Sequence, residues 1–287
     1  MKASLFTVAL ALAGCSAGQH GAPRIDPALA ALVPADSVML AGIRMAELRS
    51  TPIYQKLMSQ QRLSDLDDFA KRTNFDPRKD VTEMLITSDG VNTVVLARGA
   101  FKPRPPESVK QSAYKGVTIF GGPDGSFAIL DASTAVAGVD RAVRKAIDQK
   151  QSGRAAAGAL LDRARSLPAT AQIWLVANGW RPLPEGANLS NMTRLFQSIE
   201  SATATVDLRS GITAVAQGEC RTEQDAKSLA EAIRGMVALG RLSVPEKQPE
   251  MLRLYDGIKA EQKQRSIHLN VQIPADLVDR LPTLNTR

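Results

Sequence analysis

The sequence has little of the chemistry on which most catalytic and nucleic-acid-binding sites depend. It contains two histidines and two cysteines, and aromatic residues make up 4% of its 287 residues. So few histidines and cysteines leave little material for a Ser–His–Asp triad or for a tetrahedral zinc shell. So few aromatics leave no stacking platform for single-stranded nucleic acid. We therefore predict no catalytic residue, no metal site, no cofactor and no nucleic-acid partner.

The sequence also lacks an apolar run long enough to cross a membrane, for which a helix needs about 20 apolar residues. The apolar run Leu5–Leu12 is much shorter, follows Lys2, and is closed by the small residues Ala13 and Gly14 before Cys15. A positive start, a short apolar core and small residues at its end are typical of an export signal rather than a spanning segment.

The segment Leu12-Ala13-Gly14-Cys15 resembles the lipobox of bacterial lipoproteins. The resemblance implies that residues 1–14 are a signal peptide, that cleavage falls between Gly14 and Cys15, and that the Cys15 sulfur carries lipid. Two or more acyl chains hold a protein stably on a membrane. We therefore predict a lipid-anchored envelope protein that faces the periplasm. The resemblance also implies that Ser16, in place of the aspartate that retains such lipoproteins in the inner membrane, favours the outer membrane. The alternatives are a chance Ala-Gly-Cys in an ordinary cleaved signal and a buried N-terminal helix.

Residues 15–35 begin with small and polar residues and are predicted to be a flexible tether. The formal net charge is +7, with basic and acidic residues interspersed. The densest basic stretch, Lys102–Pro106, is interpreted as a surface loop, with contact to anionic headgroups as the alternative. If Cys15 carries lipid, Cys220 has no disulfide partner and is predicted to be a small buried apolar residue.

Apolar patterning predicts an α+β fold in two halves, 36–168 and 169–287, after the tether. In the first half we expect a strand at 37–43, a hairpin at 84–96 that turns at Ser88-Asp89-Gly90, a second hairpin at 117–130 that turns at 121–125, and helices over 134–150 and 155–166.

The second half has the clearer order of elements. We expect a strand at 171–177, a helix at 189–199, strands at 202–208 and 212–220, a helix capped by Thr222, and a strand at 266–273. The order β-α-β-β-α-β is that of the split β-α-β or ferredoxin-like arrangement. We predict two such halves, each an antiparallel sheet with helices packed on one face, with one continuous sheet as an option.

One polar surface patch is the best candidate site. Because His20 lies in the predicted tether, His268 is the sole histidine that could serve as a base. Strand alternation places His268, Asn270 and Gln272 on one face of their strand. Thr203, Thr205 and Asp207 share a face of another strand. If the two strands are neighbours, these six residues form a patch with His268 near Asp207. An ordinary solvated sheet face is the alternative.

The sequence as a whole resembles uncharacterised bacterial lipoproteins with repeated α+β modules, through residues 33–40, 137–143 and 220–226. The resemblance implies an envelope location and this fold, and it supplies no reaction. We expect a non-catalytic protein that presents its α+β domain to a protein partner in the envelope. One alternative is a carrier of an apolar ligand or lipid, which needs an apolar cavity of about 300 Å³ or more between sheet and helices. A second alternative is a hydrolase that uses His268.

Overall fold

The structure of the protein is a computed structural model that describes residues 25–60, 67–68, 70–71, 75–102, 109–152, 157–179, 196–244 and 251–278. Its strands are β1 (Met39–Ile43), β2 (Val81–Ser88), β3 (Thr93–Gly99), β4 (Gln111–Tyr114), β5 (Val117–Gly122), β6 (Gly125–Asp131), β7 (Thr134–Gly138), β8 (Ile173–Asn178), β9 (Ile199–Asp207), β10 (Gly211–Cys220), β11 (Ile258–Lys263) and β12 (Ser266–Pro274). Its helices are α1 (Pro27–Ala30), α2 (Met45–Arg49), α3 (Pro52–Gln60), α5 (Pro77–Asp80), α6 (Asp140–Ser152), α7 (Gly158–Arg165), α9 (Glu223–Leu242), α10 (Leu252–Asp256) and α11 (Ala275–Val278).

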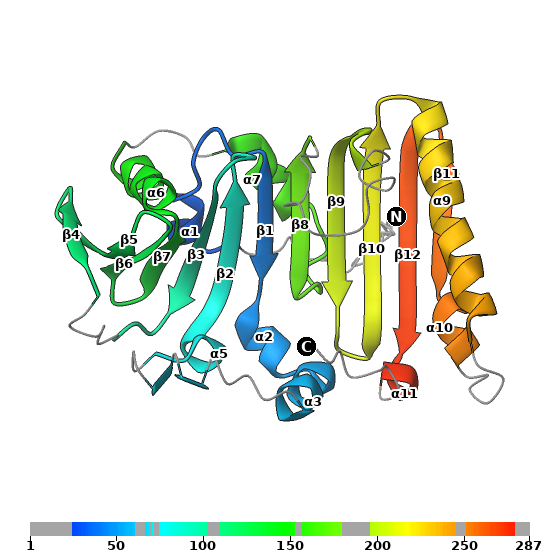
Figure 1. Ribbon diagram of the computed structural model, residues 1–287, viewed down its shortest axis with the longest axis horizontal. Helices are drawn as coiled ribbons and strands as arrows, with labels where there is room; N and C mark the ends of the chain where they lie inside the picture. The colour runs from blue at the N-terminus through cyan, green and yellow to red at the C-terminus, as the bar shows by residue number, and fades with distance from the viewer. Residues whose placement is uncertain are drawn as a thin grey trace, which may run out of the picture.

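All the strands described join one 12-stranded sheet in the order β11-β12-β10-β9-β8-β1-β2-β3-β7-β6-β5-β4 (Figure 1). Every neighbouring pair is antiparallel, which confirms the predicted α+β class. The predicted halves meet where β1 pairs with β8, so the sheet runs through both without a break. At this seam Gly42 pairs with Trp174, a core residue that is 3% exposed. A side chain at position 42 would collide with the Trp174 indole, so only glycine fits there.

The helices of the two halves cover opposite faces of this sheet. The larger core cluster joins residues of α1, α6 and α7 to Leu40, Leu85 and Leu96 of the central strands. The smaller cluster joins α9 to Ile267 of β12. Strand register aligns Ile267 with Met39, the neighbour of Leu40, and adjacent residues of a strand point to opposite faces. Figure 1 shows α9 lying over the edge strand β11, at the opposite end of the sheet from β4.

The predicted tether is wrong over its second half, because residues 25–35 belong to the folded domain. The Asp26 carboxylate caps α1 by accepting the N–H of Ala28 at 2.7 Å. Leu29, Leu32 and Val33 are fully buried, since their helix-like spacing places them together against the sheet. Residues 15–24 lie outside the described part of the chain.

The helix predicted over 134–150 begins too early. Residues Thr134–Gly138 form β7, which pairs with both β3 and β6, and α6 begins at Asp140. Val136 and Val139 gave the pattern a helical spacing, although Val136 packs into the core from a strand. The strands β4 and β11 were not predicted either. Both lie at sheet edges and carry mostly exposed polar residues, which hide the alternation of a strand.

Two predictions about single residues are confirmed. Thr222 caps α9, because its Oγ1 accepts the N–H of Asp225 at 3.0 Å. Cys220 is fully buried within the smaller cluster, and burial raises the pKa of its thiol. Among the helices described, none is long and apolar enough to cross a bilayer.

Candidate functional site

The sheet face opposite α6 is apolar in the N-terminal half, although no described helix packs over its centre. It presents partly buried residues of three neighbouring strands: Met84 and Ile86 of β2, Val95 and Ala97 of β3, and Ala135 and Ala137 of β7. An antiparallel sheet that is covered on one face normally turns polar residues to the other. An apolar second face therefore indicates an interaction site for a ligand, a membrane or another protein.

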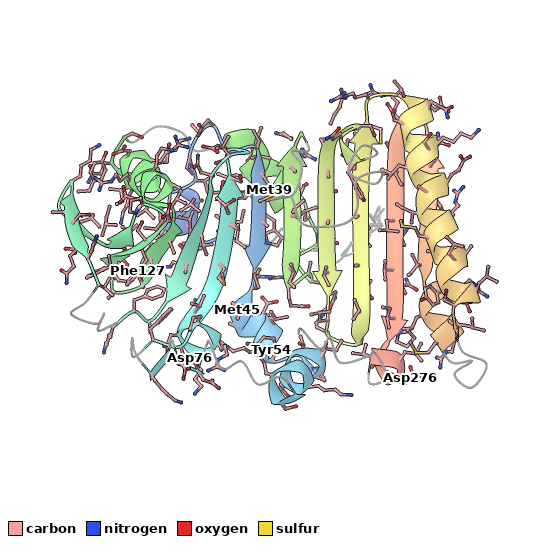
Figure 2. The ribbon with its side chains drawn as sticks, in the orientation of Figure 1. Met39, Met45, Tyr54, Asp76, Phe127 and Asp276 are labelled. Carbon is pink, nitrogen blue, oxygen red and sulfur yellow. The ribbon has the colours of Figure 1, made fainter. Side chains whose placement is uncertain are left out.

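This face contains an apolar groove of about 450 Å³. Its central strands contribute the small side chains of Ala97, Ala135 and Ala137, which leave the hollow. Phenylalanines border it in two pairs. Phe120 and Phe127 stack with ring centroids 5.1 Å apart, and Phe75 and Phe101 are tilted with centroids 5.4 Å apart. Figure 2 labels Phe127 on β6 at this part of the sheet. The groove is therefore lined mainly by apolar and aromatic side chains, as small-molecule sites usually are.

Sequence reasoning missed this groove, although the sequence carries a signal for it. The segments Met84-Leu85-Ile86, Val94-Val95-Leu96-Ala97 and Ala135-Val136-Ala137 are apolar at successive positions, so both faces of each strand are apolar. Such runs are typical of strands that are covered on both sides. Here α6 and its neighbours cover one side, and the groove lies on the other.

The six residues of the predicted polar patch share one sheet face, but their strands are not neighbours. β10 lies between β9 and β12. Register places His268 in line with Gln217 and Thr203, and Asn270 in line with Val215 and Thr205. Asp207 lies in line with Thr213 and Gln272, at the far end of the patch from His268. The condition for a pair of His268 with Asp207 is therefore not met.

Asp207 makes other contacts instead. Its carboxylate accepts from Arg209 Nε at 3.0 Å, and this guanidinium lowers the pKa of Asp207. Gln172 also lies within hydrogen-bond reach of the same carboxylate. Asp207 is therefore not placed to orient His268, and the hydrolase alternative loses the pair on which it depended.

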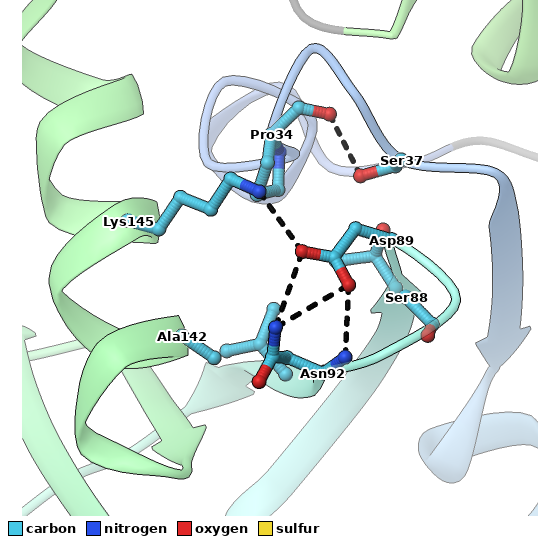
Figure 3. Close-up of a pocket in the computed structure, with 9 residues that line it drawn as sticks. Pro34, Ser37, Ser88, Asp89, Asn92, Ala142 and Lys145 are labelled. Atoms are coloured by element: carbon cyan, nitrogen blue, oxygen red, sulfur yellow. Dashed lines mark hydrogen bonds and ion pairs between the residues drawn. The ribbon is translucent and has the colours of Figure 1, made fainter.

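A second, very small pocket lies between α6 and the β2–β3 turn (Figure 3). The Asp89 carboxylate accepts the N–H of Asn92 at 2.8 Å and of Val91 at 3.0 Å, and Lys145 Nζ lies 2.9 Å from it. Burial alone would raise the pKa of Asp89, but these donors outweigh it and hold the pKa well below its ordinary value. The pocket volume of about 10 Å³ is about that of one water, which is too small for a ligand. The contacts of Asp89 therefore stabilise the fold by joining α6 to the β2–β3 turn.

Two predicted sites are not placed by the structure. Gly14 and Cys15 lie outside the described residues, and lipid attachment at Cys15 stays a prediction. Within the described ranges, no group of three histidine, cysteine, aspartate or glutamate side chains is arranged to hold a metal ion.

The fold is similar to that of TP0453. Crystal form III of TP0453 aligns with a TM-score of 0.51 at 8% identity, covering 89% of this chain and 97% of that chain. Crystal form I aligns with a TM-score of 0.47 at 9% identity, covering 89% and 96%. At such low identity the likeness shows the fold alone. No protein-family model and no curated protein matches the sequence.

Proposed function

We propose that this protein is a non-catalytic envelope protein that binds one apolar chain in the groove beside β3 and β7. The observation that carries the proposal is the groove itself, an apolar hollow of about 450 Å³ on a sheet face that should otherwise be polar. This volume exceeds the lower limit of about 300 Å³ for small-molecule sites. The groove lies on the sheet face away from α6 and not between sheet and helices, where a carrier site was expected.

The predicted lipid anchor would bring this groove close to a source of apolar ligands. A lipidated Cys15 would hold the domain at a membrane surface, where apolar chains are abundant. Metabolic labelling with a fatty acid tests that part independently. Labelled wild-type protein beside unlabelled Cys15→Ser protein would support the anchor, and an unlabelled wild type would remove it.

The groove is tested by native mass spectrometry of protein gently extracted from its own envelope. We expect a co-purified small molecule with an apolar chain. Ala137→Phe should reduce its occupancy at least severalfold, because the added ring fills the centre of the groove. Ala113→Phe adds the same ring at an exposed position of the edge strand β4 and should leave occupancy unchanged. A wild-type protein that carries no small molecule would contradict the proposal.

Presentation to a protein partner is the second candidate, and α9 favours it. Met236, Leu239 and Leu242 are 44%, 65% and 83% exposed and follow one another at intervals of three residues. A photoreactive residue at position 239 should capture a discrete protein in the envelope, whereas the same residue at the exposed position 227 should not. Equal capture at both positions would count against a docking surface on α9.

A further inference from the structure

A second hollow adjoins the apolar groove and is lined by lysines. It measures about 580 Å³, and Lys71, Lys79 and Lys102 contribute its basic side chains. The two hollows share Phe75. The chain also crosses from one to the other at two further points. Val81 and Phe101 line the groove, and their neighbours Asp80 and Lys102 line the lysine cleft. The two hollows therefore lie side by side, and an elongated molecule that extends past Phe75 would enter both.

The lysines of this cleft are available to an anion. The side chains of Lys71 and Lys79 are 78% and 80% exposed. Each lies 3.8 Å from one carboxylate, which is too far for a hydrogen bond. Lys102 is exposed and forms no ion pair with the described residues. The three ammonium groups therefore retain N–H donors for hydrogen bonds to a bound anion.

The two carboxylates of the cleft are occupied by the protein itself. Asp76 accepts from Arg78 Nε at 2.8 Å, and this guanidinium lowers the pKa of Asp76. The Asp80 carboxylate accepts the N–H of Asp76 at 2.7 Å. These bonds hold both carboxylates at the start and end of α5. Both carboxylates stay charged, so the lining of the cleft keeps a net charge of +1 from its three lysines and two aspartates.

We infer that the groove's ligand is a long-chain fatty acid whose carboxylate lies among Lys71, Lys79 and Lys102. The inference rests on the proposed function and adds the chemical class of the ligand. Apolar walls bind the chain, and charge complementarity fixes its direction, with the anionic end at the Phe75–Phe101 border. A volume of about 450 Å³ is near the lower end of the range for ligand sites, so one chain fits it better than a lipid with two.

The test compares two probes that differ in the head group alone, hexadecanoate and hexadecanol. Binding is measured by equilibrium dialysis at pH 8, below the concentration at which either probe aggregates. The full-length chain carries Cys15→Ser, so that its own predicted acyl chains cannot compete. We expect hexadecanoate to bind about tenfold more tightly than hexadecanol, as three modest ion pairs together would provide.

The lysines are tested with matched charge variants. The triple variant Lys71→Gln, Lys79→Gln and Lys102→Gln should lose this tenfold preference while it binds hexadecanol as before, which also shows that it is folded. The control triple Lys227→Gln, Lys259→Gln and Lys263→Gln removes the same charge from exposed positions of the C-terminal half and should keep the preference.

The outcomes separate the inference from the function on which it rests. Equal binding of both probes by the unsubstituted lysine cleft would overturn the inference and leave the groove intact. Failure of both probes to bind would remove the groove function as well. If the cleft variant bound hexadecanoate normally but lost binding to vesicles that contain anionic lipid, the lysines would contact a bilayer instead, and the inference would again be wrong.

Discussion

Asp89 shows how one carboxylate joins elements that are distant in sequence. It closes the β2–β3 turn through the N–H groups of Val91 and Asn92, and it binds Lys145 of α6 (Figure 3). Lys145 also pairs with Asp36, at the start of the chain that leads into β1. These contacts hold the pKa of Asp89 below its ordinary value. The ionised form therefore stabilises the fold.

We predict that Asp89→Ala lowers the free energy of unfolding by about 1–3 kcal/mol at pH 7, since it leaves partly buried donors unsatisfied. The unfolded carboxyl titrates near pH 4. Because the folded pKa lies below that value, the stabilisation is complete above about pH 5 and is lost as the pH falls through the folded pKa. The difference between wild type and variant, measured by urea unfolding, should therefore shrink between pH 5 and pH 2.

Asp124→Ala is the matched control, because Asp124 is an exposed aspartate in the β5–β6 turn. We expect it to change stability by less than about 0.5 kcal/mol at every pH. An Asp89→Ala penalty that stayed constant from pH 7 to pH 2 would show that the charge of Asp89 is not what stabilises the turn.

Among the elements, α1 shows that the folded domain begins well before the first strand. Leu32 is the second residue after the end of the helix and is fully buried. We predict that Leu32→Ala lowers the free energy of unfolding by about 2–5 kcal/mol, because it leaves a cavity in the main core. Ala31→Ser, at the exposed neighbouring position, should cost less than about 1 kcal/mol. A Leu32→Ala protein as stable as wild type in thermal unfolding would restore the tether to its predicted length.

Local signals in the sequence predicted local features well. The Asp-Gly pair marked the β2–β3 turn, where Gly90 has a φ of 87°, which glycine adopts without strain. Thr222 marked the start of α9. The errors arose where a segment's partner decides its structure. Val136 fits a helix and a strand equally well, and pairing with β3 and β6 makes it a strand.

The candidate sites show the same division between local and distant information. Alternation placed His268 and Asp207 on the correct faces of their strands, but it could not show that β10 separates them. The apolar groove depends on which face α6 covers, and no local pattern specifies that. The lysine cleft brings together Lys71, Lys79 and Lys102 from separate segments, so their proximity was equally hidden.

In the whole molecule, the helices lie on opposite faces of one sheet, and this arrangement determines where ligands can bind. In the N-terminal half, the face that the helices do not cover is apolar and contains the groove. In the C-terminal half, the uncovered face is the opposite one, and it carries polar residues such as Thr213 and Gln217. Both faces depend on one seam, the pairing of β1 with β8. The position of Trp174 over Gly42 holds the two strands in that register.

The seam leads to a prediction about cooperativity. If it couples the halves, unfolding followed by far-UV circular dichroism and by tryptophan fluorescence should give coincident transitions. Gly42→Ala should shift both curves together and cost about 1–3 kcal/mol, because the new methyl group overpacks against the Trp174 indole. Gly158→Ala adds a methyl group that meets no atom within 4 Å and should leave the curves nearly unchanged. Two separate transitions in the wild-type protein would mean that the halves fold independently. The groove and its lysine cleft, which lie wholly in the N-terminal half, would then keep their ligand after the C-terminal half had unfolded.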